Sequence, residues 1–259
     1  FSGDIETMNA VTSDETNTFE FNAALLGQLA TSALSRARLY HFFELALAHP
    51  GEEGYDYFQQ ESTEKEFLES YSGLLRNDVM LLEKGTASAR AFFSKLQKHS
   101  YEDVEAAHIS LFSANYPYLP CPPYGSLFTA IDSDKRLEEM LAIKVFYQKN
   151  GVDIAETFDD LPDHLCVELE FSQLLCFREN EASAKEDFGV LAGIWKAQAE
   201  FLDKFLLPLG NNLAELAVAS KLDNLYGDLL EAMRCFLLQH RGELTATVES
   251  SSLNQEDQT

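Results

Sequence analysis

The segment AALLGQLATSALSRARLYHFFELALA, residues 23–48, determines the expected fold of this 259-residue chain. Its large apolar residues recur at steps of three and four, the spacing of one face of an α-helix. These residues are Leu25, Leu26, Leu29, Leu34, Leu39, Phe42, Phe43 and Leu47. Pro50 and Gly51 follow the segment and end the pattern. The chain therefore opens its ordered part with a long amphipathic helix.

The same helical pattern continues along most of the chain, and no convincing period-two strand or Asn-Gly hairpin interrupts it. Caps and stop residues predict further helices at 63–82, 100–115, 134–149, 163–180, 183–206, 211–220 and 223–240. The sequence thus predicts an all-α protein, a single helical bundle domain of about eight to ten helices over residues 21–242. Residues 1–20 form a predicted flexible acidic tail, and residues 243–259 a flexible polar one.

The overall charge excludes several classes of partner. The chain has 43 acidic and 19 basic residues, a net charge of −24. Nucleic acids and anionic membrane surfaces need clustered Lys and Arg, so neither is an expected partner. No apolar run reaches the ~18 residues of a membrane span. A basic or partly apolar protein segment suits this charge better.

The cysteines indicate a reducing compartment. Cys121, Cys166, Cys176 and Cys235 show no C-x-x-C spacing, and four are too few for a disulfide scaffold in a chain of this length. We expect free, mostly buried thiols in the cytoplasm.

Two irregular segments stand out between the predicted helices. Residues 116–126 hold four of the seven prolines and three tyrosines, which predicts a stiff loop that presents aromatic rings. Residues 150–163 are long for a connection inside a helical bundle, which predicts a hinge or a binding loop. Functional residues are concentrated in such loops, so both segments are candidate sites.

Possible chemistry near residue 163 has competing interpretations. Asp163 is placed to cap the next helix. His164 is expected in the first turn of that helix, where it could either bind a ligand or have a purely structural role. His164 and Glu168 share a helix face and could hold a metal, although no zinc-protease pattern is present. Neither a nucleophile motif nor a phosphate loop is present, so we predict no catalytic residue, no cofactor and no enzyme activity.

The strongest local charge coincides with the second irregular segment. Residues 153–187 contain eleven acidic and two basic residues. Part of this is an ordinary solvated face. Beside a stiff aromatic loop, however, such a surface could bind a peptide that carries arginines and an apolar stretch.

Two motifs make the chain resemble a known family. Residues 122–128, PPYGSLF, are similar to the proline–aromatic–x–Ser–apolar–aromatic signature of the TorD/DmsD/NarJ redox-enzyme maturation chaperones. Residues 161–165, LPDHL, followed by ELEF at 168–171, resemble the family's hinge motif. The Leu-Pro-Asp-His order is most similar to the nitrate reductase branch, and Tyr124 stands where the family often has Trp.

The resemblance implies a cytoplasmic, client-specific chaperone. Such proteins bind the N-terminal or twin-arginine signal segment of the catalytic subunit of a molybdopterin oxidoreductase. They hold that subunit for cofactor insertion before assembly or export, often in anaerobic respiration. The matching positions Tyr124, Ser126, Asp163 and His164 become candidate peptide-binding residues, and the neighbours Tyr118, Pro122 and Pro123 join them on chemistry. Some relatives exchange helices across the hinge, so a monomer or a hinge-exchanged dimer is expected.

Two other functions remain open at this stage. One is a metal-dependent hydrolase that uses His164 and Glu168. The other is an acidic helical scaffold that binds basic proteins without selectivity. Metal analysis would identify the first, and a steep loss of affinity with salt the second.

Overall fold

The computed structural model describes residues 23–115, 117–155, 160–220 and 225–256, and these residues form an all-α bundle. The predicted fold class is therefore confirmed. The elements are α1 (Ala23–Leu47), α2 (Glu52–Phe58), α3 (Glu61–Ser72), α4 (Val79–Leu96), α5 (Tyr101–His108), the π-helical turn η1 (Ile109–Ser113), α6 (Ser126–Thr129), α7 (Ser133–Lys149), α8 (Leu165–Ala184), α9 (Phe188–Phe201), the π-helical turn η2 (Leu202–Leu206), α10 (Leu207–Ala219) and α11 (Leu225–Glu256). The acidic tail predicted at 1–20 lies outside the described residues.

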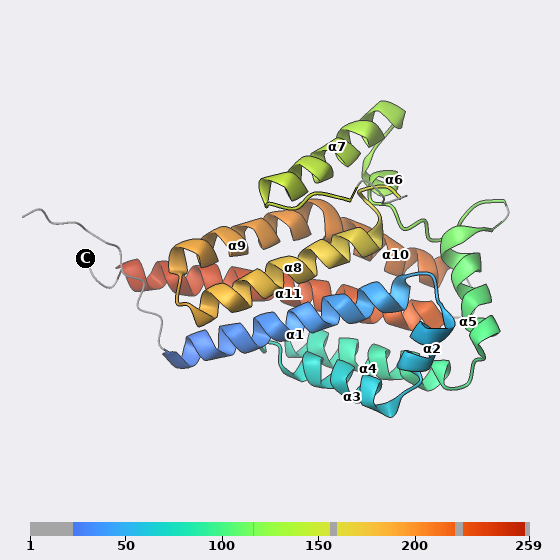
Figure 1. The fold of residues 1–259 in the computed structure, drawn as a ribbon, viewed down its shortest axis with the longest axis horizontal. Coiled ribbons are helices and arrows are strands. Elements are labelled where there is room, and N and C mark those ends of the chain that lie inside the picture. Colours follow the sequence, from blue (N-terminus) through green and yellow to red (C-terminus); the bar gives the residue numbers. More distant parts are fainter. Residues whose placement is uncertain (1–22, 116, 156–159, 221–224, 257–259) are drawn as a thin grey trace, which may run out of the picture.

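Long helices pack lengthwise around one core. Helix α1 packs mainly on α8, and α11 packs on α4 and α10 (Figure 1). Helix α9 lies on the other side of α8. Helix α8 thus has neighbours on two sides, which explains why even its polar residues Glu168, Ser172 and Glu179 are buried.

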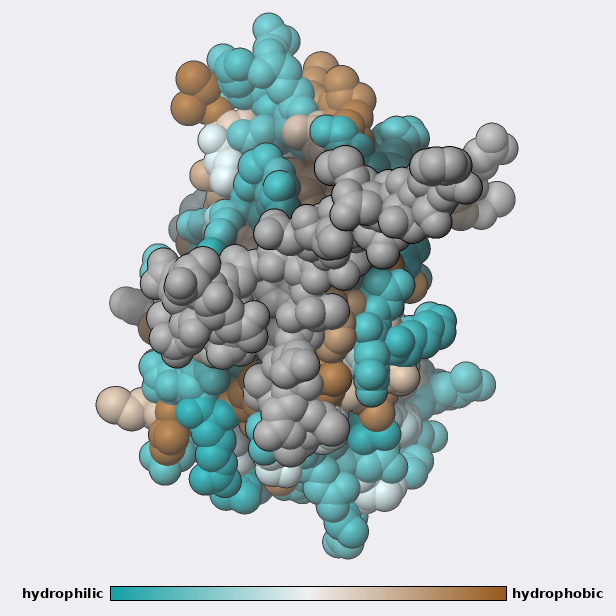
Figure 2. Space-filling view, turned by 90° about the vertical axis from the view of Figure 1, so that its left-hand side faces the viewer, coloured by the Kyte–Doolittle hydropathy of each residue, from teal (hydrophilic) through white to brown (hydrophobic). Residues whose placement is uncertain are grey.

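Helix α7 stands apart from the other long helices, at the top of Figure 1. It buries Ile143, Phe146 and Tyr147 toward the bundle. Its other face exposes Leu137 and Leu141, which are 63% and 62% accessible. Figure 2 shows hydrophobic residues among hydrophilic ones at this upper level of the molecule.

The prediction of one continuous helix at 63–82 is wrong. The chain forms α3 and α4 with a break at 73–78, and Asp78 caps α4 by accepting from the Leu81 N–H at 3.1 Å. Gly85 lies inside α4, where a Cβ would stand 2.9 Å from the Tyr71 ring. This glycine therefore permits close helix packing and does not end a helix.

Two further boundaries differ from the predictions. The predicted start at Ser183 is wrong, because α8 continues to Ala184 and Asp187 caps α9. Helix α11 continues past residue 242, where a polar tail is predicted, and Glu243 and Leu244 are buried in the core. By contrast, the helix start predicted at residue 100 is confirmed, because Ser100 and Asp103 form a capping box at the start of α5.

Four free cysteines are present, three buried and Cys166 half-buried, as predicted. Among the helices of the described segments, none combines the length and the apolar character that crossing a bilayer requires.

Candidate functional site

The proline-rich loop and the start of α8 join through a short backbone pairing. The Gly125 N–H donates to the Asp163 carbonyl at 3.0 Å, and the Leu165 N–H donates to the Pro123 carbonyl at 2.9 Å. These two bonds form an isolated antiparallel bridge between Tyr124 and His164. The two segments singled out in the sequence, about 40 residues apart, therefore meet in space.

The predicted capping role of Asp163 is wrong. Asp163 is 3% exposed, and its Oδ2 accepts from the Ser126 N–H at 2.9 Å instead of from the first turn of α8. His164 is the N-cap, and its Nδ1 accepts from the Cys166 N–H at 3.2 Å. Because the Asp163 carboxylate accepts from the Ser126 N–H, the next polar residue, His164, caps α8 in its place.

The rings of Tyr124 and His164 pack edge to face, with centroids 5.2 Å apart. Burial lowers the pKa of His164, although Asp160, whose Oδ2 lies 3.8 Å from Nε2, acts in the opposite direction. Burial, reinforced by a hydrogen bond with Asp160, raises the pKa of Tyr124 to about 12. Both rings are therefore neutral near pH 7, and each presents an apolar face with a polar edge.

A cavity of about 510 Å³ opens on the Tyr124–His164 side of this junction. Its apolar lining includes Leu47 of α1, Phe112 of η1 and Pro123 of the loop. Carboxylates of Glu44, Asp160 and Glu170 also line it, together with His49, His108 and His164. The described lining residues include no Lys or Arg. The cavity, here called the acidic groove, thus combines apolar walls with negative charge.

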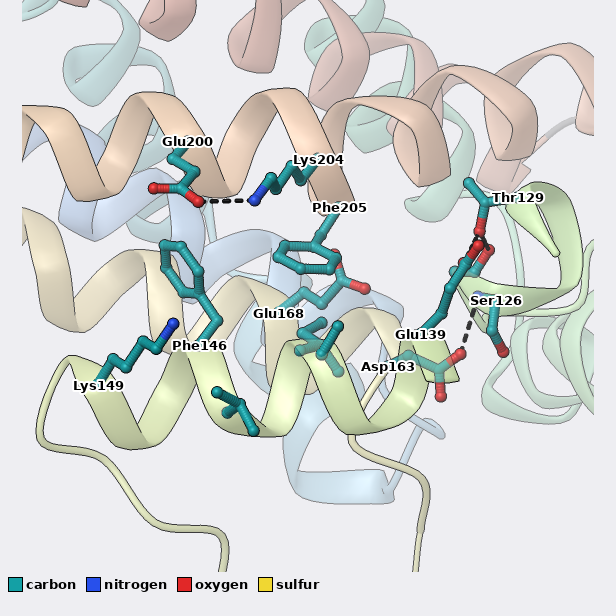
Figure 3. A pocket seen from close by; sticks show the side chains of 14 residues that line it. Ser126, Thr129, Glu139, Phe146, Lys149, Asp163, Glu168, Glu200, Lys204 and Phe205 are labelled. Atoms are coloured by element: carbon teal, nitrogen blue, oxygen red, sulfur yellow. Dashed lines mark hydrogen bonds and ion pairs between the residues drawn. The ribbon is translucent and has the colours of Figure 1, made fainter. Parts of the chain in front are cut away.

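A second cavity, of about 380 Å³, lies on the other side of the same junction. Residues of α6, α7, α8, α9 and η2 line it, and it is here called the inner cavity. Figure 3 shows Asp163 and Glu139 at one end with Ser126 and Thr129, and Lys149 at the other end. At the side drawn uppermost, Lys204 Nζ pairs with Glu200 Oε1 at 2.7 Å.

Glu168 is the least expected residue of the inner cavity. Its side chain is fully buried, and neither carboxylate oxygen has a hydrogen-bond partner. Burial, and then the negative charge of Asp163, raise its pKa well above the usual value. Gly125 permits this arrangement, because a Cβ there would stand 3.1 Å from Glu168 Oε1.

The predicted site residues thus divide among three environments. Pro123, Tyr124 and His164 line the acidic groove, whereas Ser126 and Asp163 line the inner cavity. The remaining two predicted residues are absent from the lining of both cavities. Of these, Pro122 is half-buried, and Tyr118 is 74% exposed.

Sequence reasoning missed the contribution of earlier helices to the groove. Glu44 and Leu47 come from the end of α1, and His108 ends α5. Glu44 and Leu47 show no local signal, because the junction residues Tyr124 and His164 are more than 70 positions away in the sequence. The packing of α1 on α8 brings these two residues to the junction, and His108 lies beside them because its Nε2 hydrogen-bonds with the Leu47 carbonyl at 3.1 Å.

The proposed metal pair is not assembled. His164 lines the acidic groove, whereas Glu168 lines the inner cavity. Across the described parts of the chain, no group of three or more His, Cys, Asp or Glu side chains is arranged to hold a metal ion.

A comparison with known families identifies the middle of the chain. Residues 80–215 match the family described as the nitrate reductase delta subunit. This match runs from the start of α4 through most of α10 and includes the junction, the inner cavity and the part of the acidic groove that lies outside residues 44–49. A search of curated proteins finds none that matches the chain.

Proposed function

The chain belongs to the nitrate reductase delta subunit family, whose members are maturation chaperones of molybdoenzymes, and from this premise we propose that it binds the N-terminal segment of one such enzyme's catalytic subunit. In this proposal the chaperone acts in the cytoplasm and is itself no enzyme. It holds the subunit until cofactor insertion is complete, before assembly or export. A twin-arginine signal is the proposed client segment where the enzyme is exported.

The acidic groove is the observation that carries this proposal. Peptide recognition requires a concave apolar surface with a few oriented polar groups, and the groove provides both. Its wall at the junction is stiff, because Pro123 and His164 lie in paired backbone. A preordered wall reduces the entropy that binding costs.

Charge in the groove selects the kind of client segment. Glu44, Asp160 and Glu170 lie around the apolar lining, and burial raises the pKa of Glu44. A segment with basic residues beside an apolar stretch complements this surface. Apolar burial then supplies most of the affinity, while the carboxylates favour basic residues and speed association.

Calorimetry with a client peptide tests the proposal. The probe is a synthetic peptide of the N-terminal segment of a molybdoenzyme catalytic subunit from the same organism, and the control is a scrambled peptide of the same composition. We expect the native order to bind at least about tenfold more tightly, and its affinity to persist between about 50 and about 300 mM salt.

Two results would contradict the proposal. Equal binding of native and scrambled peptides, with a steep loss of affinity in salt, would identify the non-selective acidic scaffold. If the native peptide does not bind at any salt concentration, the N-terminal segment is not what the chaperone recognises.

A further inference from the structure

The inner cavity contains two buried carboxylates that lack sufficient partners. Glu168 is 0% exposed and Asp163 is 3% exposed. Three of their four oxygens have no hydrogen-bond partner: Asp163 Oδ1, Glu168 Oε1 and Glu168 Oε2. Buried polar groups are nearly always paired, because an unpaired one loses its hydration without compensation. Two such acids in the lining of an open cavity indicate that another molecule supplies the missing hydrogen-bond donors.

The cations of the cavity do not fulfil that role. Lys204 pairs with Glu200, and Lys149 is exposed at the far end of the cavity (Figure 3). The pKa of Glu168 is raised by burial and by Asp163, with no lowering contribution from a cation. Arg136 lies near the acidic end, where its Nε donates to Ser126 Oγ at 3.5 Å, but it forms no hydrogen bond with the three unpaired carboxylate oxygens. These oxygens are therefore complementary to a further positive charge.

The walls determine the shape of the missing cation. Ile143 and Phe146 of α7 and Phe205 of η2 form apolar parts of the cavity lining. A hydrated inorganic ion would gain little from such walls, whereas an aliphatic stem would bury apolar surface against them. Its volume, about 380 Å³, lies in the range of small-ligand sites.

We propose that the inner cavity binds a guanidinium group on an aliphatic stem, the side chain of an arginine, with Asp163 and Glu168 as its acceptors. A guanidinium has five donors in a rigid fork and is weakly hydrated, so it suits several acceptors in a buried site better than an ammonium does. The assignment to an arginine of the client rests on the proposed function. The cavity and its ligand chemistry do not.

Binding at this site is linked to a proton. Glu168 must ionise to pair with the guanidinium, so the affinity rises with pH until Glu168 is ionised in the free protein. The titratable and charged groups that face Glu168 are Asp163 before α8, Glu139, Tyr147 and Lys149 of α7, Glu200 of α9 and Lys204 of η2.

The test uses the full chain and two small probes, N-acetylarginine methylamide and its neutral analogue N-acetylcitrulline methylamide. Binding is followed by heteronuclear NMR at about pH 6 and about pH 8. We expect the arginine probe to shift signals of the inner cavity, to bind more tightly at the higher pH, and to bind about 10- to 100-fold more tightly than the citrulline probe. Equal binding of the two probes would overturn the proposal without any mutation.

Two variants locate the site. Glu168→Gln keeps the shape of the side chain and removes its charge, and we expect it to weaken the arginine probe by about tenfold or more and to abolish the pH dependence. Glu181→Gln is the matched control, because Glu181 is an exposed acid of the same helix that lines neither cavity. An unchanged affinity in Glu168→Gln, with the fold verified by circular dichroism, would also overturn the proposal.

The outcome is separable from that of the proposed function. If the client peptide binds but the arginine probe does not, the inner cavity has no such ligand and the chaperone proposal stands. If the arginine probe binds but no client peptide does, the cavity assignment stands and the client assignment fails.

Discussion

Asp163 Oδ2 and the backbone N–H of Ser126 form a hydrogen bond of 2.9 Å between residues 37 positions apart. Both residues are buried. Together with the Tyr124–His164 bridge, this bond fixes the proline-rich loop to the start of α8. The same junction separates the acidic groove from the inner cavity, so its rigidity bears on both proposed sites.

The Asp163–Ser126 bond makes a prediction about stability. Asp163→Ala leaves the buried Ser126 N–H without an acceptor, which should lower the free energy of unfolding by about 1–3 kcal/mol. Asp163→Asn retains a carbonyl oxygen that can accept the same bond, so it should cost clearly less. Urea unfolding of the two variants measures the difference. Equal losses would mean that the bond contributes nothing specific.

His164 has two roles that substitution can separate. His164→Ala removes the N-cap of α8, which should cost about 0.5–2 kcal/mol of stability, and also removes a wall of the acidic groove. His164→Asn restores a good cap without the imidazole ring. We expect Asn to recover the stability in urea unfolding, but not the client-peptide affinity in calorimetry. Recovery of both would show that His164 acts only as a cap.

The sequence predicted the helices with clear periodicity and identified the two irregular segments as candidate sites. Residues 23–48 form α1 almost as expected, because one face of that helix is apolar. The partner of Asp163 was not predictable, because an Asp before a helix can accept equally well from an N–H of the helix or from an N–H of a distant loop. The choice between the two N–H groups depends on how closely the loop packs against the start of α8, and Gly125 permits that close packing because it has no side chain.

Buried charge was the other feature that the sequence could not reveal. Charged residues on a helix usually indicate a solvated face, yet Glu168 and Glu179 of α8 are buried. Their burial follows from the tertiary position of α8, with α1 and α9 packed against it. Periodicity describes one helix at a time and does not contain this information.

Arg36 forms the centre of a buried ionic network that joins three helices. It pairs with Glu179 of α8 at 2.6 Å and with Glu243 of α11. Arg36→Ala leaves two buried carboxylates uncompensated and should lower the free energy of unfolding by about 3–5 kcal/mol. Adding Glu179→Gln and Glu243→Gln to that variant should restore part of the loss. Urea unfolding of both variants measures these changes in the free energy of unfolding. If the added Gln substitutions restore nothing, unpaired carboxylates are not the cause of the loss in Arg36→Ala.

The raised pKa of Glu168 predicts how stability depends on pH. In the unfolded chain this carboxyl ionises near its ordinary value of 4.5, whereas in the folded chain its pKa is well above that value because of burial and Asp163. The stability that the folded state gains from holding this proton is complete below about pH 4.5, and it is lost as the pH rises toward the folded pKa.

Glu168→Gln removes this titration and leaves the other acidic residues of the chain in place. The free energy of unfolding of the wild type should therefore fall relative to that of Glu168→Gln by about 1.4 kcal/mol per pH unit above about pH 4.5, up to the folded pKa. Urea unfolding at about pH 5, 6 and 7 measures the slope. Glu181→Gln should run parallel to the wild type, because Glu181 is exposed. A parallel course for Glu168→Gln as well would mean that folding does not raise the pKa of Glu168.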